Sequence, residues 1–307
     1  MTVPTRDAAT VLLVRDALDG QGDQGVEVCM LLRNLNSDFV GGAYVFPGGS
    51  VDPADRHPDV ESLCRGRSDA EASTVLGIEA GGLAFWVAAL RECFEEAGVL
   101  VARSVDGRGG PGPDGPGGLL DTSEPEVAAR FAGYRQAVYA GSMGLLDVCR
   151  LEGLVLAVDE VFYVSHWITP DLAPKRYDTR FFLTAAPPGQ VARHDDGETV
   201  ASEWIRPAAA LARCLAGEME LLPPTIANLR SIEGFATAAE VMAWAATVTD
   251  VPRMLPVVLI RDGELLILRP GDEGYEDALA EREASGEVDP ALADATRSVW
   301  GPRPDPG

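Results

Sequence analysis

The sequence predicts an α+β protein, and three observations carry that prediction. Two apolar, β-branched runs at residues 8–15 and 26–33 are separated by a stretch rich in Gly, Asp and Gln, which predicts an N-terminal strand pair. Apolar side chains mostly three or four apart predict a helix over residues 84–97 that ends at Gly98. Further strand-like and helical runs then share the second half of the chain.

The elements between the strand pair and the helix are short. Residues 39–46 predict a strand that runs into a glycine turn, Phe46-Pro47-Gly48-Gly49, whose backbone can approach a ligand closely. Residues 56–83 are polar and contain several glycines, so they predict an inserted segment with one or two short helices. After the helix, residues 99–101 predict the start of a buried strand. Residues 104–118 hold too much Gly and Pro to pack, and predict a flexible loop.

The second half of the chain alternates strands with helices. The pattern predicts a helical segment at 124–149, strands at 162–169, 177–185 and 199–205, and helices at 207–216 and 223–247. A hairpin around Asp262-Gly263 and an acidic tail follow. We therefore predict a main domain over residues 1–250 and a C-terminal appendage over residues 251–307.

Composition narrows the function classes. A formal net charge of −23 over 307 residues argues against a nucleic-acid or anionic membrane surface, both of which need a basic face. No apolar stretch reaches the roughly 18 residues that span a bilayer, no signal peptide is evident, and the C-terminus lacks a Ser-Lys-Leu address. Five widely spaced cysteines are typical of reduced core thiols. We expect a cytoplasmic protein with a small-molecule partner. A homodimer is a possible assembly.

Three carboxylates on the predicted helix are the candidate chemical centre. Glu92, Glu95 and Glu96 are spaced i, i+3 and i+4, so a helix places them on one face within a turn of each other. Three anions this close favour a bound cation, and oxygen-only ligands suit Mg²⁺ or Mn²⁺. The alternative is a solvated acidic helix face.

These residues resemble a known motif. Gly49-x5-Asp55 followed by Arg91-Glu92-Cys93-Phe94-Glu95-Glu96-Ala97-Gly98-Val99 resembles the Nudix box, GX5EX7REUXEEXGU. Asp55 stands where the family has Glu, and residues 56–90 replace a spacer of seven, an insertion of about 28 residues. The interruption resembles the branch that includes peroxisomal coenzyme A diphosphatases. Local matches at 39–49, 166–170, 176–182 and 222–225 extend the resemblance to about residues 7–232.

The resemblance implies an α/β/α sandwich with a mixed sheet, and hydrolysis of a diphosphate linkage in a nucleotide derivative. It implies that Glu92, Glu95, Glu96 and the Gly48 carbonyl hold Mg²⁺ or Mn²⁺, with Glu92 also positioning the water. Arg91 is expected to pair with a nearby carboxylate. The family also has an acid before a late strand that ends in Trp. Glu198, six residues before Trp204, is the candidate base or extra ligand, and Glu203 is the second choice.

Substrate assignment depends on the same resemblance. Phe46 could stack on a base, and Arg176 and Arg180 could hold a substrate phosphate, although salt bridges are an alternative for both arginines. Arg33 fits the first arginine of the coenzyme A signature, but Asp38 stands where a second is expected. Coenzyme A or acyl-coenzyme A is the leading substrate. The alternatives are a dinucleotide such as NADH or ADP-ribose, and a non-catalytic nucleotide sensor on the same scaffold.

Overall fold

The structure, a computed structural model, describes residues 3–17, 25–35, 40–105, 118–195, 197–261, 264–285, 292 and 296. Several predicted features lie outside these ranges. They are the turn between the first two strands, most of the loop at 104–118, the Asp262-Gly263 turn and the end of the acidic tail. Within the described residues, no helix is both long enough and apolar enough to cross a membrane.

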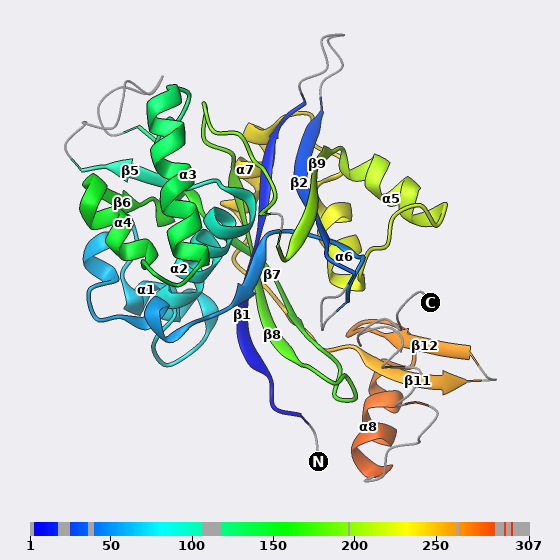
Figure 1. Cartoon of the computed structure of the whole chain (residues 1–307). Helices are drawn as coiled ribbons and strands as arrows, with labels where there is room; N and C mark the ends of the chain where they lie inside the picture. The colour runs from blue at the N-terminus through cyan, green and yellow to red at the C-terminus, as the bar shows by residue number, and fades with distance from the viewer. Residues whose placement is uncertain are drawn as a thin grey trace.

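A mixed sheet forms the centre of the molecule, with the order β10-β7-β8-β1-β2-β3, β4 pairing with β1 and β9 pairing with β2 (Figure 1). Its strands are β1 (Arg6–Asp16), β2 (Val26–Arg33), β3 (Tyr44–Val45), β4 (Gly48–Ser50), β7 (Phe162–Ile168), β8 (Tyr177–Ala185), β9 (Thr199–Ile205) and β10 (Arg253–Met254). β1 runs antiparallel to β2 and parallel to β8. The predicted α+β class with a mixed sheet is confirmed.

Helices cover both faces of this sheet (Figure 1). One layer contains α1 (Asp69–Leu76), α2 (Leu83–Glu92), α3 (Pro125–Tyr139) and α4 (Leu145–Glu152), and the other contains α5 (Pro207–Leu215), α6 (Pro223–Ile232) and α7 (Ala238–Ala245). Successive side chains of β1 enter different cores: Val11 and Leu13 pack in the α2 core, while Leu12 and Val14 pack in the opposite one. Because both faces of β1 are buried, its sequence is a continuous apolar run.

Helix α2 is the core element that carries the candidate site. Trp86 is fully buried, donates from its indole Nε1 to the Val161 carbonyl at 2.9 Å, and lies 4.7 Å from the Phe182 ring. After Glu92 the helix widens into a π-helical turn, η3 (Cys93–Ala97), and stops at Gly98 with a φ of 72°. The predicted helix is therefore present, but its last turn is π-helical.

Arg135 of α3 stabilises this wide turn. Its guanidinium donates to the carbonyls of Glu95 and Glu96, each at 2.8 Å, so the open end of the helix is satisfied by a side chain. The π turn changes the relative directions of the three acids from those of a regular α-helix. Glu96 is buried, whereas Glu95 stays partly exposed.

The prediction of a strand over residues 39–46 and a glycine turn after it was wrong in part. The described part of that strand is only β3, and Gly48 and Gly49 belong to strand β4, paired with Thr10 and Ala9 of β1. A Cβ on Gly48 would lie 2.7 Å from the Ala9 carbonyl oxygen, and one on Gly49 would lie 2.3 Å from a Glu92 carboxylate oxygen. The glycines thus let β4 lie close to both β1 and α2.

Smaller elements surround the site. The insertion contains η1 (Pro53–Arg56), η2 (Glu61–Leu63) and α1, while β5 (Ala102–Ser104) pairs with β6 (Leu154–Leu156), and η4 (Val158–Glu160) precedes β7. The predicted strand start at 99–101 is buried but irregular, and strand pairing begins only at Ala102.

The C-terminal segment forms a compact addition of β11 (Val257–Arg261), β12 (Glu264–Leu268) and α8 (Tyr275–Ser285). Val257, Leu268 and Tyr275 are buried together in a small apolar cluster. Val258 packs instead against Ala173, which lies in the connection between β7 and β8. The boundary at residue 250 stays a prediction.

Acid should weaken one ion-pair cluster on β7 and β8. Asp178 accepts a hydrogen bond from His166 Nε2 at 2.7 Å and pairs with Arg180. Although burial opposes ionisation, His166 and Arg180 hold the pKa of Asp178 below its usual value of 3.8. A lowered pKa gives stability that is complete above the unfolded-state pKa and is lost as the pH falls through the folded-state pKa. We expect the free energy of unfolding of the wild type to fall more steeply below about pH 4 than that of Asp178→Asn.

Urea titrations between about pH 2.5 and 7 measure this difference. The variant should be less stable than the wild type at pH 7, and the gap should narrow toward pH 2.5. A gap that stays constant over the whole range would contradict the assignment.

Candidate active site

Arg91 is the centre of the candidate site. Its guanidinium makes two contacts of 3.0 Å with the two carboxylate oxygens of Asp55. It also donates to Glu92 at 2.8 Å, to Glu95 at 3.3 Å and to the Ser50 carbonyl at 2.8 Å. Asp55 is 2% exposed and is therefore a buried partner of Arg91. One cation thus orients three carboxylates.

The charges around Arg91 do not balance. Burial raises the pKa of Asp55, and the hydrogen bonds from Arg91 only partly offset that effect. Burial alone would lower the pKa of Arg91, but Asp55, Glu92 and Glu95 raise it above its ordinary value. Because one guanidinium faces several carboxylates, the cluster retains an excess of negative charge that a further cation could neutralise.

Glu96 is the most buried of the helix acids. Its side chain is 3% exposed; Oε2 accepts from the Gly48 N–H at 2.9 Å, and Oε1 has no hydrogen-bond partner among the described residues. Burial, then the nearby charge of Glu92, raises the pKa of Glu96 well above its usual value. Burial is also the main reason that the pKa of Glu92 rises to about 7. An unpartnered oxygen beside a second carboxylate fits a divalent cation with oxygen ligands.

The three helix carboxylates have two different partners, Arg91 and the Gly48 amide. Across the described ranges, no three acidic, His or Cys side chains converge into a ready-made metal cage. Arg91 holds Glu92 and Glu95, and the Gly48 amide holds Glu96. The donor set nevertheless suits Mg²⁺ or Mn²⁺, because it consists of carboxylate oxygens and contains no thiolate or imidazole. The predicted role of the Gly48 carbonyl stays a prediction.

A pocket of about 650 Å³ opens beside these acids. Its acidic end is formed by Asp52, Glu92, Glu95 and Glu198, and Arg91 lines the same end. Glu96 is not among the lining residues and lies beneath them. The structure therefore brings Glu92, Glu95 and Glu198 to one pocket wall.

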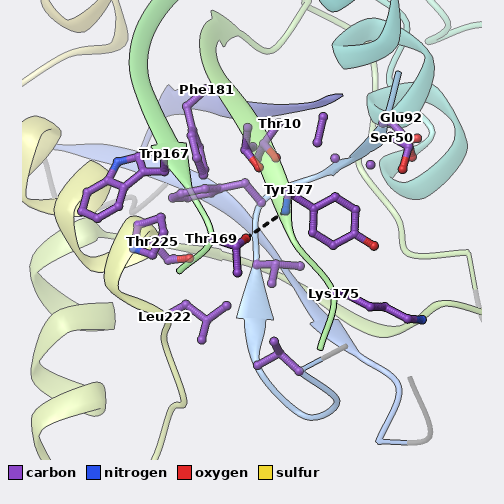
Figure 2. Close-up of a pocket in the computed structure, with 18 of the residues that line it drawn as sticks. Thr10, Ser50, Glu92, Trp167, Thr169, Lys175, Tyr177, Phe181, Leu222 and Thr225 are labelled. Atoms are coloured by element: carbon purple, nitrogen blue, oxygen red, sulfur yellow. Dashed lines mark hydrogen bonds between the residues drawn. The ribbon is translucent and has the colours of Figure 1, made fainter. Parts of the chain in front are cut away.

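The rest of the pocket is apolar on one side and polar on another (Figure 2). Trp167, Phe181 and Leu222 gather on one side of the view, and Glu92 lies on the other. The predicted residue Phe46 also lines the pocket, but it is 2% exposed and packs in the core. The apolar wall suits an uncharged part of a ligand, whereas the acidic end suits a cation, through which an anionic group of a ligand could be held.

The two candidate late acids have different environments. Glu198 is exposed and lines the pocket, and its backbone N–H donates a hydrogen bond to Asp195 Oδ2 at 3.3 Å. Glu203 is not a pocket residue; it pairs with Arg213 at 2.8 Å. The geometry therefore favours Glu198 over Glu203 as the acid that acts with the helix carboxylates.

The suggestion that Arg176 and Arg180 hold a substrate phosphate does not agree with the geometry. Neither lines the pocket. Arg176 donates to the carbonyls of Thr169 and Val3, and Arg180 is buried against Asp178 and the Phe85 ring. The sequence alone could not decide between a substrate contact and a salt bridge or backbone contact, because the partners of both arginines come from distant segments. Both arginines serve as fold contacts.

Sequence reasoning missed two pocket residues in the same region. Lys175 and Tyr177 line the pocket beside Thr169, whose hydroxyl oxygen accepts from the Tyr177 N–H at 3.1 Å (Figure 2). A signal for Lys175 was present: it is the only lysine in a chain with a formal net charge of −23. Its place in the pocket depends on the β7–β8 pairing.

Comparisons with known proteins identify relatives that match most of the chain. A family model described as the NUDT19 Nudix domain matches residues 5–232. The chain is 28% identical over 279 residues to human acyl-coenzyme A diphosphatase NUDT19, covering 82% of this chain and 73% of the relative. It is also 28% identical to the Gallus gallus protein of the same name, covering 89% and 80%.

A solved structure agrees with these matches. The crystal structure of a NUDIX hydrolase from Alicyclobacillus acidocaldarius is 25% identical and superposes with a TM-score of 0.58. The match covers 82% of this chain and all of that one.

Proposed function

Because the chain belongs to the Nudix hydrolase family, within the group described as the NUDT19 Nudix domain, we propose that it hydrolyses the diphosphate linkage of coenzyme A or acyl-coenzyme A. The products would be adenosine 3′,5′-bisphosphate and a 4′-phosphopantetheine species. The relatives named above are acyl-coenzyme A diphosphatases, and this supports the choice of substrate. The apolar wall of the pocket gives further support, since coenzyme A carries an uncharged arm beside its nucleotide.

One observation carries the catalytic part of the proposal. Glu96 is buried with an unpartnered Oε1 beside Glu92, beneath a pocket wall that also holds Glu95 and Glu198. Nudix hydrolases generally need divalent metal ions. We assign Glu92, Glu95, Glu96 and the Gly48 carbonyl as the groups that would hold Mg²⁺ or Mn²⁺. When bound, the metal would neutralise phosphate oxygens and make the attacking water more acidic.

The chain's own residues have distinct tasks in this mechanism. Arg91 fixes the direction of the Glu92 and Glu95 carboxylates, and Asp55 fixes Arg91. Glu198 is the residue that accepts the proton of the attacking water as it adds to phosphorus. The bond between that phosphorus and the bridging oxygen breaks, and the other phosphate leaves with the bridging oxygen and its half of the substrate. Phe46, Trp167 and Leu222 exclude water from the apolar side of the pocket.

A hydrolysis panel tests the proposal. The purified protein is given coenzyme A, acetyl-coenzyme A, NADH, ADP-ribose and a nucleoside triphosphate, each with Mg²⁺, with Mn²⁺ or with EDTA. We expect metal-dependent cleavage that is fastest for the coenzyme A compounds, with adenosine 3′,5′-bisphosphate as a product. Chromatography of the products measures both the rate and the bond that is cleaved.

The other outcomes separate the alternatives. Faster cleavage of NADH or ADP-ribose would support diphosphate hydrolysis but contradict coenzyme A as the substrate. Binding of metal and nucleotide without any product would favour a sensing module.

A further inference from the structure

Lys175 occupies a special place in this acidic chain. It is the single lysine among 307 residues, and it lines the pocket together with two arginines, Arg33 and Arg91. Arg91 is engaged by Asp55, Glu92 and Glu95, and the charge of Arg33 acts on Glu96. Both arginines therefore belong to the acidic end. Lys175 brings positive charge to a different part of the pocket (Figure 2).

The segment that carries Lys175 is fixed by the C-terminal addition. Ala173 is 1% exposed and packs against Val258 of β11. Asp171 pairs with Arg282 of α8 at 2.8 Å. Pro256, directly before β11, lines the same pocket. The appendage thus supports the connection between β7 and β8 from outside.

The segment is also fixed from inside. Arg176, next to Lys175, donates to the Thr169 carbonyl at 3.0 Å and to the Val3 carbonyl at 2.9 Å. The first hydrogen bond joins the two ends of the connection between β7 and β8, and the second joins the connection to the N-terminal segment. The backbone at Lys175 is therefore fixed on both sides. A fixed backbone reduces the conformational entropy that is lost when Lys175 binds a ligand.

Sheet register sets the distance between Lys175 and the acids. Ala8 of β1 lies opposite Ser50 of β4 on one side and Thr179 of β8 on the other. Ser50 supplies the carbonyl that Arg91 binds, so Thr179 is level with the acidic end. Lys175 lies in the bend just before β8, four residues before Thr179, so the two backbone positions are at most about 14 Å apart. Its four-carbon stem spans part of this distance.

A second anion of the substrate fits this spacing. We propose that Lys175 binds the 3′-phosphate of coenzyme A, and so makes the site selective for nucleotides that carry this group. The inference rests on the proposed function, since it takes the diphosphate to lie at the acidic end. From there, the 3′-phosphate is one ribose away, whereas the pantetheine arm carries no charge that an ammonium could bind.

Paired substrates test the proposal. Dephospho-coenzyme A differs from coenzyme A only in the missing 3′-phosphate. We expect the wild type to prefer coenzyme A in kcat/KM, and Lys175→Met to lower this preference about tenfold or more through KM. A charge-assisted hydrogen bond of this kind is worth roughly 1.5–3 kcal/mol, which corresponds to that range. Lys175→Arg should keep most of the preference.

A binding measurement without turnover accompanies the kinetics. Calorimetry compares adenosine 3′,5′-bisphosphate with AMP, and the wild type should bind the bisphosphate more tightly while Lys175→Met should not. Arg130→Met is the matched control, because Arg130 is a surface cation paired with Glu152 outside the pocket. It should keep the wild-type preference in both assays.

The outcomes distinguish this proposal from the proposed function. An equal loss for coenzyme A and dephospho-coenzyme A in Lys175→Met would overturn the role of Lys175 while leaving the activity in place. If the wild type cleaves neither compound, the proposed function fails. A wild type that binds the bisphosphate no better than AMP would overturn the role of Lys175 by itself.

Discussion

Glu96→Gln should lower kcat at least about 100-fold and leave the metal-free protein no less stable than the wild type. The glutamine is nearly isosteric, and its carbonyl oxygen can still accept the hydrogen bond from Gly48 that Glu96 accepts at 2.9 Å. The substitution removes the ionisable group of a residue that is 3% exposed and lies near Glu92. Loss of a buried ionisable group relieves the cost of ionising it beside Glu92 in the metal-free protein, but it also removes a proposed metal ligand.

Two measurements separate these effects. Steady-state hydrolysis gives kcat, and thermal unfolding gives Tm with EDTA and with added Mg²⁺ or Mn²⁺. The metal should raise the Tm of the wild type by mass action and raise that of Glu96→Gln less.

Glu203→Gln is the matched control for Glu96→Gln. It changes an acid that pairs with Arg213 outside the pocket, and it should keep the wild-type response to metal. A Glu96→Gln protein that unfolds at a lower temperature in EDTA and keeps its kcat would show that Glu96 is a structural acid.

Arg91→Ala should destabilise the protein by about 3–5 kcal/mol and abolish measurable hydrolysis. Arg91 is 8% exposed and contacts Asp55, Glu92, Glu95 and the Ser50 carbonyl. Its removal leaves Asp55, which is 2% exposed, without the cation that offsets its burial. The cost arises because a buried carboxylate has lost its partner.

A double-mutant cycle measures this coupling. Urea unfolding of Arg91→Ala, Asp55→Asn and the double variant should give an interaction free energy of about 1–3 kcal/mol, because the second change costs less once its partner is gone. Arg91→Lys should recover only part of the stability, since an ammonium cannot bind the Asp55 carboxylate through two parallel bonds. Additive effects of the two single substitutions would contradict the proposed pairing.

The sequence by itself determined the parts of this protein that depend on local pattern. Apolar, β-branched and aromatic runs predicted β1, β2, β7 and β8, and spacing of three or four residues predicted α2, because each pattern is typical of one kind of buried element. The run from Arg91 to Val99 also predicted the acidic cluster, since its residues are neighbours on one helix. Gly98 predicted the end of that helix, and its φ of 72° explains why.

The tertiary structure decided the relations between distant segments. Asp55 meets Arg91 although 35 residues separate them, because β4 runs beside β1 and η1 then turns toward α2. Pairing of β4 with β1 places Gly48 and Gly49 in a strand. Pairing of β8 with β1 and β7 places Lys175, just before β8, at the pocket. Arg176 and Arg180 have the right chemistry for a phosphate, but their carbonyl and carboxylate partners are supplied by packing. Local sequence encodes periodicity and charge, whereas partners across the sheet follow from register, which a single stretch of chain does not contain.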